Sequence, residues 1–149
     1  MLVYRIGDPK GAFPIYGAEG ARRVSGRWHR KGQAAIYTSA YYSTAMLERL
    51  VHYSGKLPSG QHYIEIVIPA GITYEVVTSH SLNGWEHKDG RVARVFGAEW
   101  IDDVRSAILI VPSVVARMER NVLINPAHAD AARITPGLEA PVTWDARLF

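Results

Sequence analysis

Three separated segments carry polar side chains that suit a negatively charged ligand with an aromatic ring. The first is Ser25–Trp28, where a glycine beside an arginine and a tryptophan predicts a tight bend that presents a cation and an aromatic surface. The Arg27 guanidinium suits a phosphate or a carboxylate, and the Trp28 ring can pack on a base. A surface turn with Trp28 packed in the core would explain the same residues.

The second segment is IYTS at residues 36–39, which overlaps a predicted strand and leads into an amphipathic helix. Glu48 falls at the edge of the apolar side of this helix, and His52 lies one turn below it. A carboxylate in that position can be half-buried beside a cleft, although a helix pair at i and i+4 on the surface is the alternative. We expect the apolar stripe of the helix to consist of Met46, Leu47, Leu50 and Val51.

The third segment is the apolar run ILIVPS at residues 108–113, which ends in Ser113. A strand that stops at Pro-Ser places a hydroxyl at the rim of a sheet, where exposed loops and a rigid strand favour ligand binding. An ordinary strand end followed by a turn is the alternative. The Asn125-Pro126 pair further along indicates a turn.

Common catalytic and metal-binding motifs are absent from the chain. It contains no cysteine, which excludes disulfides, thiol catalysis and thiolate metal sites. The six histidines are scattered, without H-E-x-x-H or another close ligand pair, so we expect no metal site. No dinucleotide fingerprint, Walker lysine loop or G-x-S-x-G turn occurs. A net charge of +3 without basic runs does not favour direct binding of nucleic acid.

The elements that must position these residues are more often strands than helices. Hydrophobic periodicity predicts strands at residues 1–6, 34–38, 62–68, 73–77, 107–111, 121–124 and 142–149. It predicts helices at residues 43–54 and 90–104, with a short one at 127–132. Strands and helices do not alternate regularly, which favours an α+β fold with a mixed or antiparallel sheet and flanking helices. We expect one domain over residues 1–149.

Targeting and membrane-spanning segments are not evident. No stretch approaches the roughly 20 apolar residues that a membrane helix needs, and the first residues contain no basic stretch before a long apolar run. We therefore expect a cytoplasmic protein that does not bind membranes.

The order and content of these segments resemble the RES domain family. The resemblance covers almost the whole chain, and although each matching stretch is short, the ordered set is specific. The matching stretches are Gly26–Trp28, Ile36–Ser39, Leu47-Glu48 with His52, Val111–Ser113 and Asn121–His128, with Val3–Arg5 and Trp144–Leu148 at the two edges.

The resemblance implies a toxin that is paired with an antitoxin carrying an Xre-like helix-turn-helix domain. It implies a fold similar to that of ADP-ribosyltransferase toxins, and an enzyme that degrades NAD as its substrate, by hydrolysis or phosphorolysis, with no separate cofactor. The positions that match the family's signature, and are thus expected to be catalytic, are Arg27, Tyr37, Glu48 and Ser113. The residues expected to bind NAD are Arg5, Arg27, Trp28, Tyr37 and Ser39.

The chemistry of NAD cleavage gives these residue types plausible roles. Breaking the nicotinamide–ribose bond builds positive charge on the ribose, which the Glu48 carboxylate would stabilise. Arg27, with Arg5 as a second candidate, would hold the pyrophosphate. Tyr37 would stack on nicotinamide or bind the ribose, and Ser113 would donate to the ribose or the amide. Such a reaction requires no metal ion.

Other functions stay open at this point. A mono-ADP-ribosyltransferase would break the same bond and differ only in its acceptor, whereas a non-catalytic nucleotide-binding module would bind without turnover. A DNA-binding regulator lacks a helix-turn-helix signature here, so we expect contact with DNA only through the antitoxin. A homodimer within a larger complex is compatible with the sequence. Tyr41, Tyr42 and Trp85 are candidates for exposed interface aromatics, and packing in the core would explain them equally well.

Overall fold

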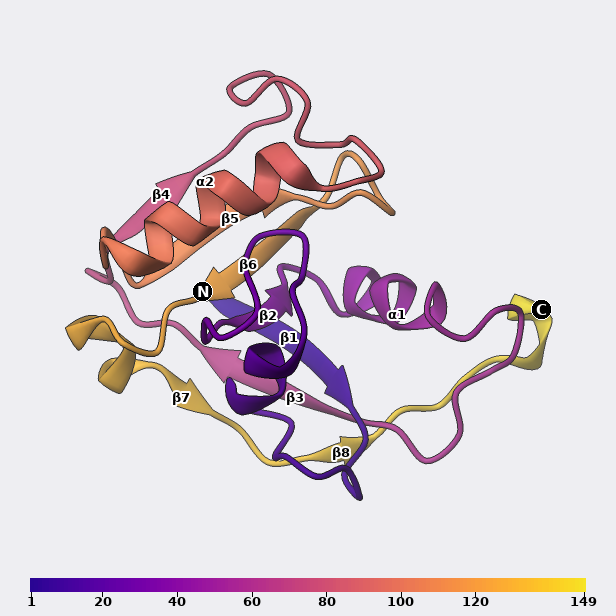
Figure 1. Ribbon diagram of the computed structural model, residues 1–149. Coiled ribbons are helices and arrows are strands. Elements are labelled where there is room, and N and C mark those ends of the chain that lie inside the picture. The colour runs from indigo at the N-terminus through magenta and orange to yellow at the C-terminus, as the bar shows by residue number, and fades with distance from the viewer.

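The computed structural model describes all residues, 1–149, and its main feature is one mixed sheet of eight strands (Figure 1). The strand order is β4-β5-β6-β2-β1-β3-β7, and β8 also pairs with β3. Only β4 and β5 are parallel, and the other pairs are antiparallel. The strands are β1 (Leu2–Gly7), β2 (Ile36–Ser39), β3 (His62–Val67), β4 (Tyr74–Val76), β5 (Ile108–Pro112), β6 (Arg120–Ile124), β7 (Thr135–Pro136) and β8 (Ala140–Pro141).

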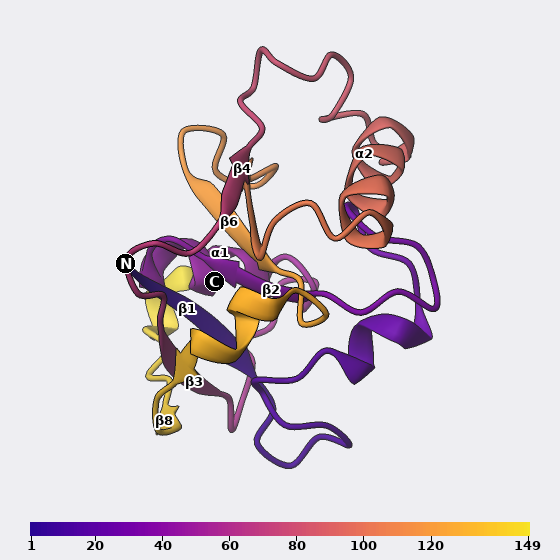
Figure 2. The same ribbon diagram turned by 90° about the vertical axis from the view of Figure 1, so that its left-hand side faces the viewer.

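Two α-helices flank the sheet, which confirms the α+β fold expected from the sequence. Helix α1 (Tyr42–Leu50) packs against β1 and β2. Helix α2 (Arg91–Asp102) lies beside the segment that joins β1 to β2 (Figure 2). Short 3-10 helices occur at η1 (Glu19–Arg23), η2 (Ala129–Arg133) and η3 (Ala146–Leu148). No helix has the length and apolar character needed to cross a membrane.

Alternate residues of the central strands feed two separate hydrophobic cores, because successive side chains of a strand point to opposite faces. On β5, Ile108 belongs to one core, whereas Leu109 and Val111 belong to the other. The first core is completed by β1, β3 and the segments around Ile15 and Ile134. The second core contains Trp85 and Trp100 and is covered by α2. The sheet is therefore buried on both faces in its middle.

Helix α1 differs from the expected helix in its length and its buried face. It ends at Leu50, and the chain then turns through Ser54 and Gly55, whose φ angles are +49° and +82°. Its buried residues are Thr44, Ala45 and Leu50. The expected apolar stripe is wrong in part, since Leu47 and Val51 are exposed. The helix lies over a polar cleft and turns small side chains toward the strands.

The tail also differs from the prediction. Residues 142–149 do not form a strand, and end instead in the 3-10 helix η3, where the Asp145 side chain accepts a hydrogen bond from the Arg147 amide. The strands β7 and β8 were not predicted, because each has two residues and contains a proline. Proline is tolerated at the edge of a sheet but obscures the sequence pattern of a strand. The helix expected at 127–132 is the 3-10 helix η2.

Candidate active site

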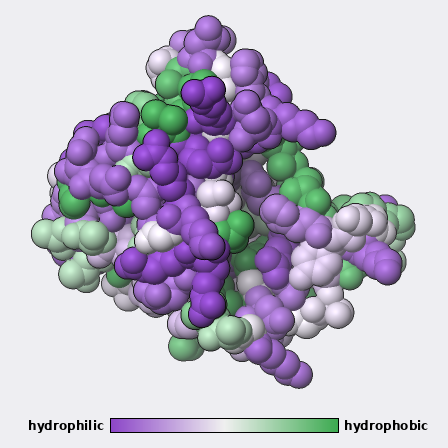
Figure 3. Space-filling model, viewed as in Figure 1, coloured by the Kyte–Doolittle hydropathy of each residue, from purple (hydrophilic) through white to green (hydrophobic).

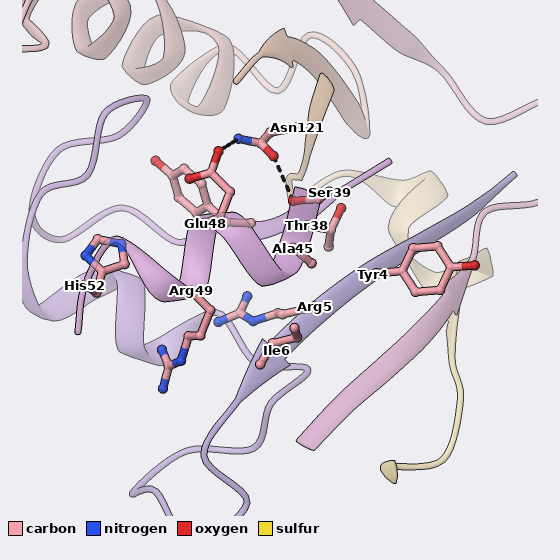
Figure 4. A pocket seen from close by; sticks show the side chains of 11 residues that line it. Tyr4, Arg5, Ile6, Thr38, Ser39, Ala45, Glu48, Arg49, His52 and Asn121 are labelled. Carbon is pink, nitrogen blue, oxygen red and sulfur yellow. Dashed lines mark hydrogen bonds between the residues drawn. The ribbon is translucent and has the colours of Figure 1, made fainter. Parts of the chain in front are cut away.

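A polar pocket opens where β1 and β2 separate beneath α1. Strand β1 pairs with β3 along its whole length but with β2 only at Tyr4 and Ser39. The gap between the two strands forms a cavity of about 250 Å³ (Figure 4). Its lining consists of Tyr4, Arg5, Ile6, Tyr37, Thr38, Ser39, Ala45, Glu48, Arg49, His52 and Asn121.

The Glu48 carboxylate is held in one orientation by two donors from other elements. Its Oε1 atom accepts hydrogen bonds from Ser113 Oγ at 2.8 Å and from Asn121 Nδ2 at 2.6 Å. Asn121 Oδ1 in turn accepts from Ser39 Oγ at 2.8 Å, and Figure 4 shows Asn121 between Ser39 and Glu48. These bonds use one carboxylate oxygen and leave Oε2 free for a ligand.

Ser113 is fully buried and does not line the pocket itself. Its hydroxyl donates to Glu48 and accepts from the Ala116 amide at 3.0 Å, so both the start of the β5–β6 loop and α1 are tied to one oxygen. Ser113 directly follows the end of β5, as expected. Its hydroxyl contacts the Glu48 carboxylate and does not line the cavity. Ser113 thus orients Glu48 in this structure.

Tyr37 contributes its ring to the pocket, while its hydroxyl is engaged behind it. The hydroxyl accepts from the Trp28 amide at 3.1 Å and lies 2.7 Å from His29 Nδ1. His29 Nε2 lies within hydrogen-bond distance of two carbonyl oxygens, which places a hydrogen on Nε2 and leaves Nδ1 to pair with the Tyr37 hydroxyl. Burial raises the pKa of Tyr37, which therefore stays neutral.

The bend at residues 25–28 wraps around the Tyr37 hydroxyl. A Cβ atom on Gly26 would lie 2.7 Å from the His29 ring and 2.8 Å from the Tyr37 oxygen. Only glycine permits such an approach. Trp28 is buried in the second core against Phe96, as in the core-packing alternative for this bend.

Arg27 does not line the cavity. Its Nη1 atom donates to the carbonyl oxygens of Trp85 at 3.0 Å and His87 at 2.9 Å, and so fastens the loop before α2. The structure thus brings Arg5, Tyr37, Ser39 and Glu48 into one pocket, with Ser113 directly behind Glu48. Arg27 and Trp28 lie outside the lining.

Two arginines provide positive charge in the pocket. Arg5 is half-buried, its buried Nη1 atom has no hydrogen-bond partner, and Arg49 follows Glu48 in α1. Burial, and then the charge of Arg49, lower the pKa of Arg5 to about 10. Neither arginine forms a salt bridge within the chain. This concentration of unpaired positive charge suits a phosphate-bearing ligand.

Sequence reasoning had not singled out Arg49 and Asn121. Asn121 stood within the family-like stretch 121–128, but its amide is significant only because β6 lies beside β2 and faces α1. For Arg49, the only feature of the sequence that could have indicated a role in the site is its position next to Glu48. No group of three or more acidic or histidine side chains is arranged to hold a metal ion.

The three candidates for exposed interface aromatics differ in outcome. Tyr42 is half-buried, and its ring packs edge-on against Tyr4 and Tyr63. Tyr41 is 61% exposed beside the N-terminus of α1. Trp85 is 2% exposed and packs in the second core, so the expectation that it forms part of an interface is wrong. Its side chain fills the space under the loop that Arg27 fastens.

Fold and pocket together define an α+β protein with a polar cleft at the split between two strands. Among known proteins, the RES domain family matches residues 2–145. A Prs ADP-ribosylating toxin from Sphingobium sp. (strain YBL2) is 42% identical over 135 residues, 87% of this chain and 84% of the relative. A protein named Toxin Res from Pseudomonas putida is 30% identical over 152 residues and is matched along the full length of both chains.

The chain therefore belongs to the RES domain family, the family of the toxins just named. Its fold is also that of a chain in the crystal structure of the M. tuberculosis MbcT–MbcA toxin–antitoxin complex. That chain superposes with a TM-score of 0.75 at 16% identity, over 95% of this chain and 84% of the other.

Proposed function

We propose that this protein is a toxin that consumes NAD by cleaving its nicotinamide–ribose bond. The observation that supports the proposal is the charge distribution of the pocket. Figure 4 shows Glu48 and Asn121 on one side of α1, and Arg5 and Arg49 on the other. NAD has the matching polarity, with a cationic nicotinamide on a ribose at one end of its reactive half and a diphosphate at the other.

The proposed chemistry needs one oriented carboxylate at the reacting centre. The nicotinamide leaves with the electron pair of the C–N bond and becomes neutral, and the ribose acquires oxocarbenium character. Glu48, whose Oε2 has no hydrogen-bond partner within the chain, stabilises that charge, and water or phosphate then adds to the ribose carbon. Because Ser113 and Asn121 already orient the acid, little reorganisation accompanies the reaction.

A second candidate function is transfer of ADP-ribose to a protein. It is favoured by the relative from Sphingobium, whose name states that it ADP-ribosylates Prs. Bond cleavage is the same in both reactions, and only the acceptor differs. NAD labelled in its adenylate half would distinguish them in a cell extract supplemented with Prs: transfer leaves label on protein, and degradation leaves only free ADP-ribose or its phosphorylated product.

Replacement of Glu48 tests the proposal directly. Glu48→Gln keeps the size of the side chain and removes the charge, so nicotinamide release should fall by about 100-fold or more, mainly in kcat. Purified protein and a nicotinamide-release assay, with and without phosphate, give the measurement. The matched control is Glu99→Gln, an exposed glutamate of α2, which should leave the rate unchanged. Full activity of Glu48→Gln would contradict the proposed function.

A further inference from the structure

We propose that Arg49 is a diphosphate-binding residue of this pocket and that Gln61 positions it. The inference rests on the proposed function in naming NAD as the ligand, but its physical claim is a two-arginine anion site. Arg49 lies in α1, Arg5 lies in β1, and both line the same cavity. Only the tertiary structure brings the two arginines together, because they are far apart in the chain.

The guanidinium of Arg49 is oriented but not satisfied. Its Nε donates to Gln61 Oε1 at 2.7 Å, and its Nη2 donates to the Tyr53 hydroxyl at 3.2 Å. Both partners are neutral, and no hydrogen bond within the chain uses Nη1. A charge held by neutral acceptors keeps its attraction for an anion, whereas a salt bridge would have cancelled it.

Gln61 is suited to a positioning role because its side chain is buried and its Oε1 atom accepts a hydrogen bond from Arg49. It is 4% exposed, and its amide nitrogen is anchored to the Ser59 carbonyl at 3.3 Å. The amide therefore presents Oε1 to Arg49 in a fixed direction. Gln61 immediately precedes β3, the central partner of β1, so the sheet that carries Arg5 also fixes the position of Arg49.

Proximity of two cations is unfavourable without a ligand and becomes favourable with one. Arg5 and Arg49 repel each other, and neither has a carboxylate partner. A diphosphate carries two negative charges and several acceptor oxygens, so it can engage both guanidinium groups at once. A purely structural role, in which Arg49 only fastens the turn at Tyr53, would not require the free Nη1 or the position in the pocket.

Inorganic pyrophosphate is the probe for this site, measured by isothermal titration calorimetry on the full chain. Wild type should bind it, and Arg49→Gln should bind about 10- to 100-fold more weakly, the loss expected for a charge-assisted contact. The matched control Arg133→Gln removes an exposed arginine that donates only to the Ala70 carbonyl and should leave affinity unchanged. Gln61→Leu should weaken binding by several-fold. Equal affinity of wild type and Arg49→Gln, or no binding by wild type, would overturn the proposal.

A substrate comparison separates recognition of the diphosphate from a structural role. For NAD, Arg49→Gln should raise KM about tenfold or more with little change in kcat. For nicotinamide riboside, which has the same scissile bond and no phosphate, kcat/KM should be the same in variant and wild type. Equal losses on both substrates would show a structural role and refute the inference. If Arg49→Gln does not fold, Arg49→Lys serves instead and must bind pyrophosphate more weakly than wild type.

The two proposals fail in different ways. A wild-type protein that binds pyrophosphate through Arg49 but releases no nicotinamide would refute the proposed function and leave the anion site intact. If the wild type releases nicotinamide and Arg49→Gln has an unchanged KM for NAD, the anion site is refuted and the proposed function stands.

Discussion

Arg5 places a positive charge among buried groups, with no hydrogen-bond partner at Nη1. Such a charge lowers the stability of the ligand-free protein, because burial disfavours the charged form and Arg49 adds repulsion. The pocket therefore resembles many functional sites in which binding groups are kept at a cost in stability. The proposed anion ligand would recover the free energy that is lost without it.

Replacement of Arg5 by methionine should separate these two effects. Arg5→Met has a similar length and no charge, so the free energy of unfolding should rise by roughly 1–3 kcal/mol while pyrophosphate binding is lost. Urea denaturation at pH 8 and calorimetry give the two quantities. A variant that is less stable than wild type would show that the buried charge is compensated in the folded protein.

The lowered pKa of Arg5 also predicts that the stability difference between Arg5→Met and wild type depends on pH. Burial and the charge of Arg49 lower the pKa of Arg5 to about 10 in the folded protein, below the ordinary value that an arginine keeps in the unfolded chain. The unfolded state therefore binds more protons between these values, and the penalty for burying the charge, complete below pH 10, decreases as pH rises above it. The stability advantage of Arg5→Met over wild type should shrink between pH 9 and pH 11, measured by urea denaturation. A constant difference would contradict the assignment of the charge.

At the scale of elements, α2 and the bend at residues 25–28 depend on one glycine. A Cβ atom on Gly97 would lie 2.0 Å from the Trp28 carbonyl oxygen. Helix propensity alone favours alanine over glycine by about 1 kcal/mol, yet the helix keeps glycine. The close approach of α2 to the backbone of Trp28 explains this choice, and it holds the bend that encloses the Tyr37 hydroxyl.

Gly97→Ala should therefore destabilise the protein, against the prediction from helix propensity. We expect a loss of about 3 kcal/mol or more in the free energy of unfolding, since backbone atoms must move to relieve the clash. Thermal or urea denaturation measures it. Val95→Ala, at an exposed position of the same helix, is the control and should change stability by less than about 1 kcal/mol. A stable Gly97→Ala would mean that α2 can move away from Trp28 freely.

At the scale of the whole molecule, the chain lacks the large positive charge that favours direct binding of DNA. The net charge is +3, and the face seen in Figure 3 is predominantly hydrophilic, with separate apolar patches. The chain belongs to the RES domain family, whose relatives include proteins named Toxin Res, and we propose that its partner is an antitoxin. We further propose that the partner is Xre-like and that contact with DNA occurs only through it.

An electrophoretic mobility-shift assay tests this proposal. The chain alone should not shift DNA from the promoter of its own operon at about 150 mM salt, where weak non-specific contacts are reduced. The same chain co-purified with the product of the adjacent gene should shift it, and that complex should release less nicotinamide than the free chain. A specific shift by the chain alone would show that it reads DNA itself.

Much of the architecture was determined locally by the sequence. The strands at β1, β2, β3, β5 and β6 follow from apolar runs and alternation, and both α-helices follow from periodic spacing. The signature residues Tyr37, Glu48 and Ser113 were also identifiable, because a resemblance in ordered segments does not depend on knowing the contacts. These features reside in short stretches of chain.

Only the tertiary structure decided which polar groups share the pocket. Arg27 is turned toward two carbonyl groups, whereas Arg49 is brought beside Arg5 by Gln61 and the separation of β1 from β2. The rotation of α1 depends on packing against β1 and β2, which overrode the apolar stripe that its sequence favoured. The physical reason is that burial and the balance of charges are set by contacts between residues far apart in the chain, and local patterns do not contain them.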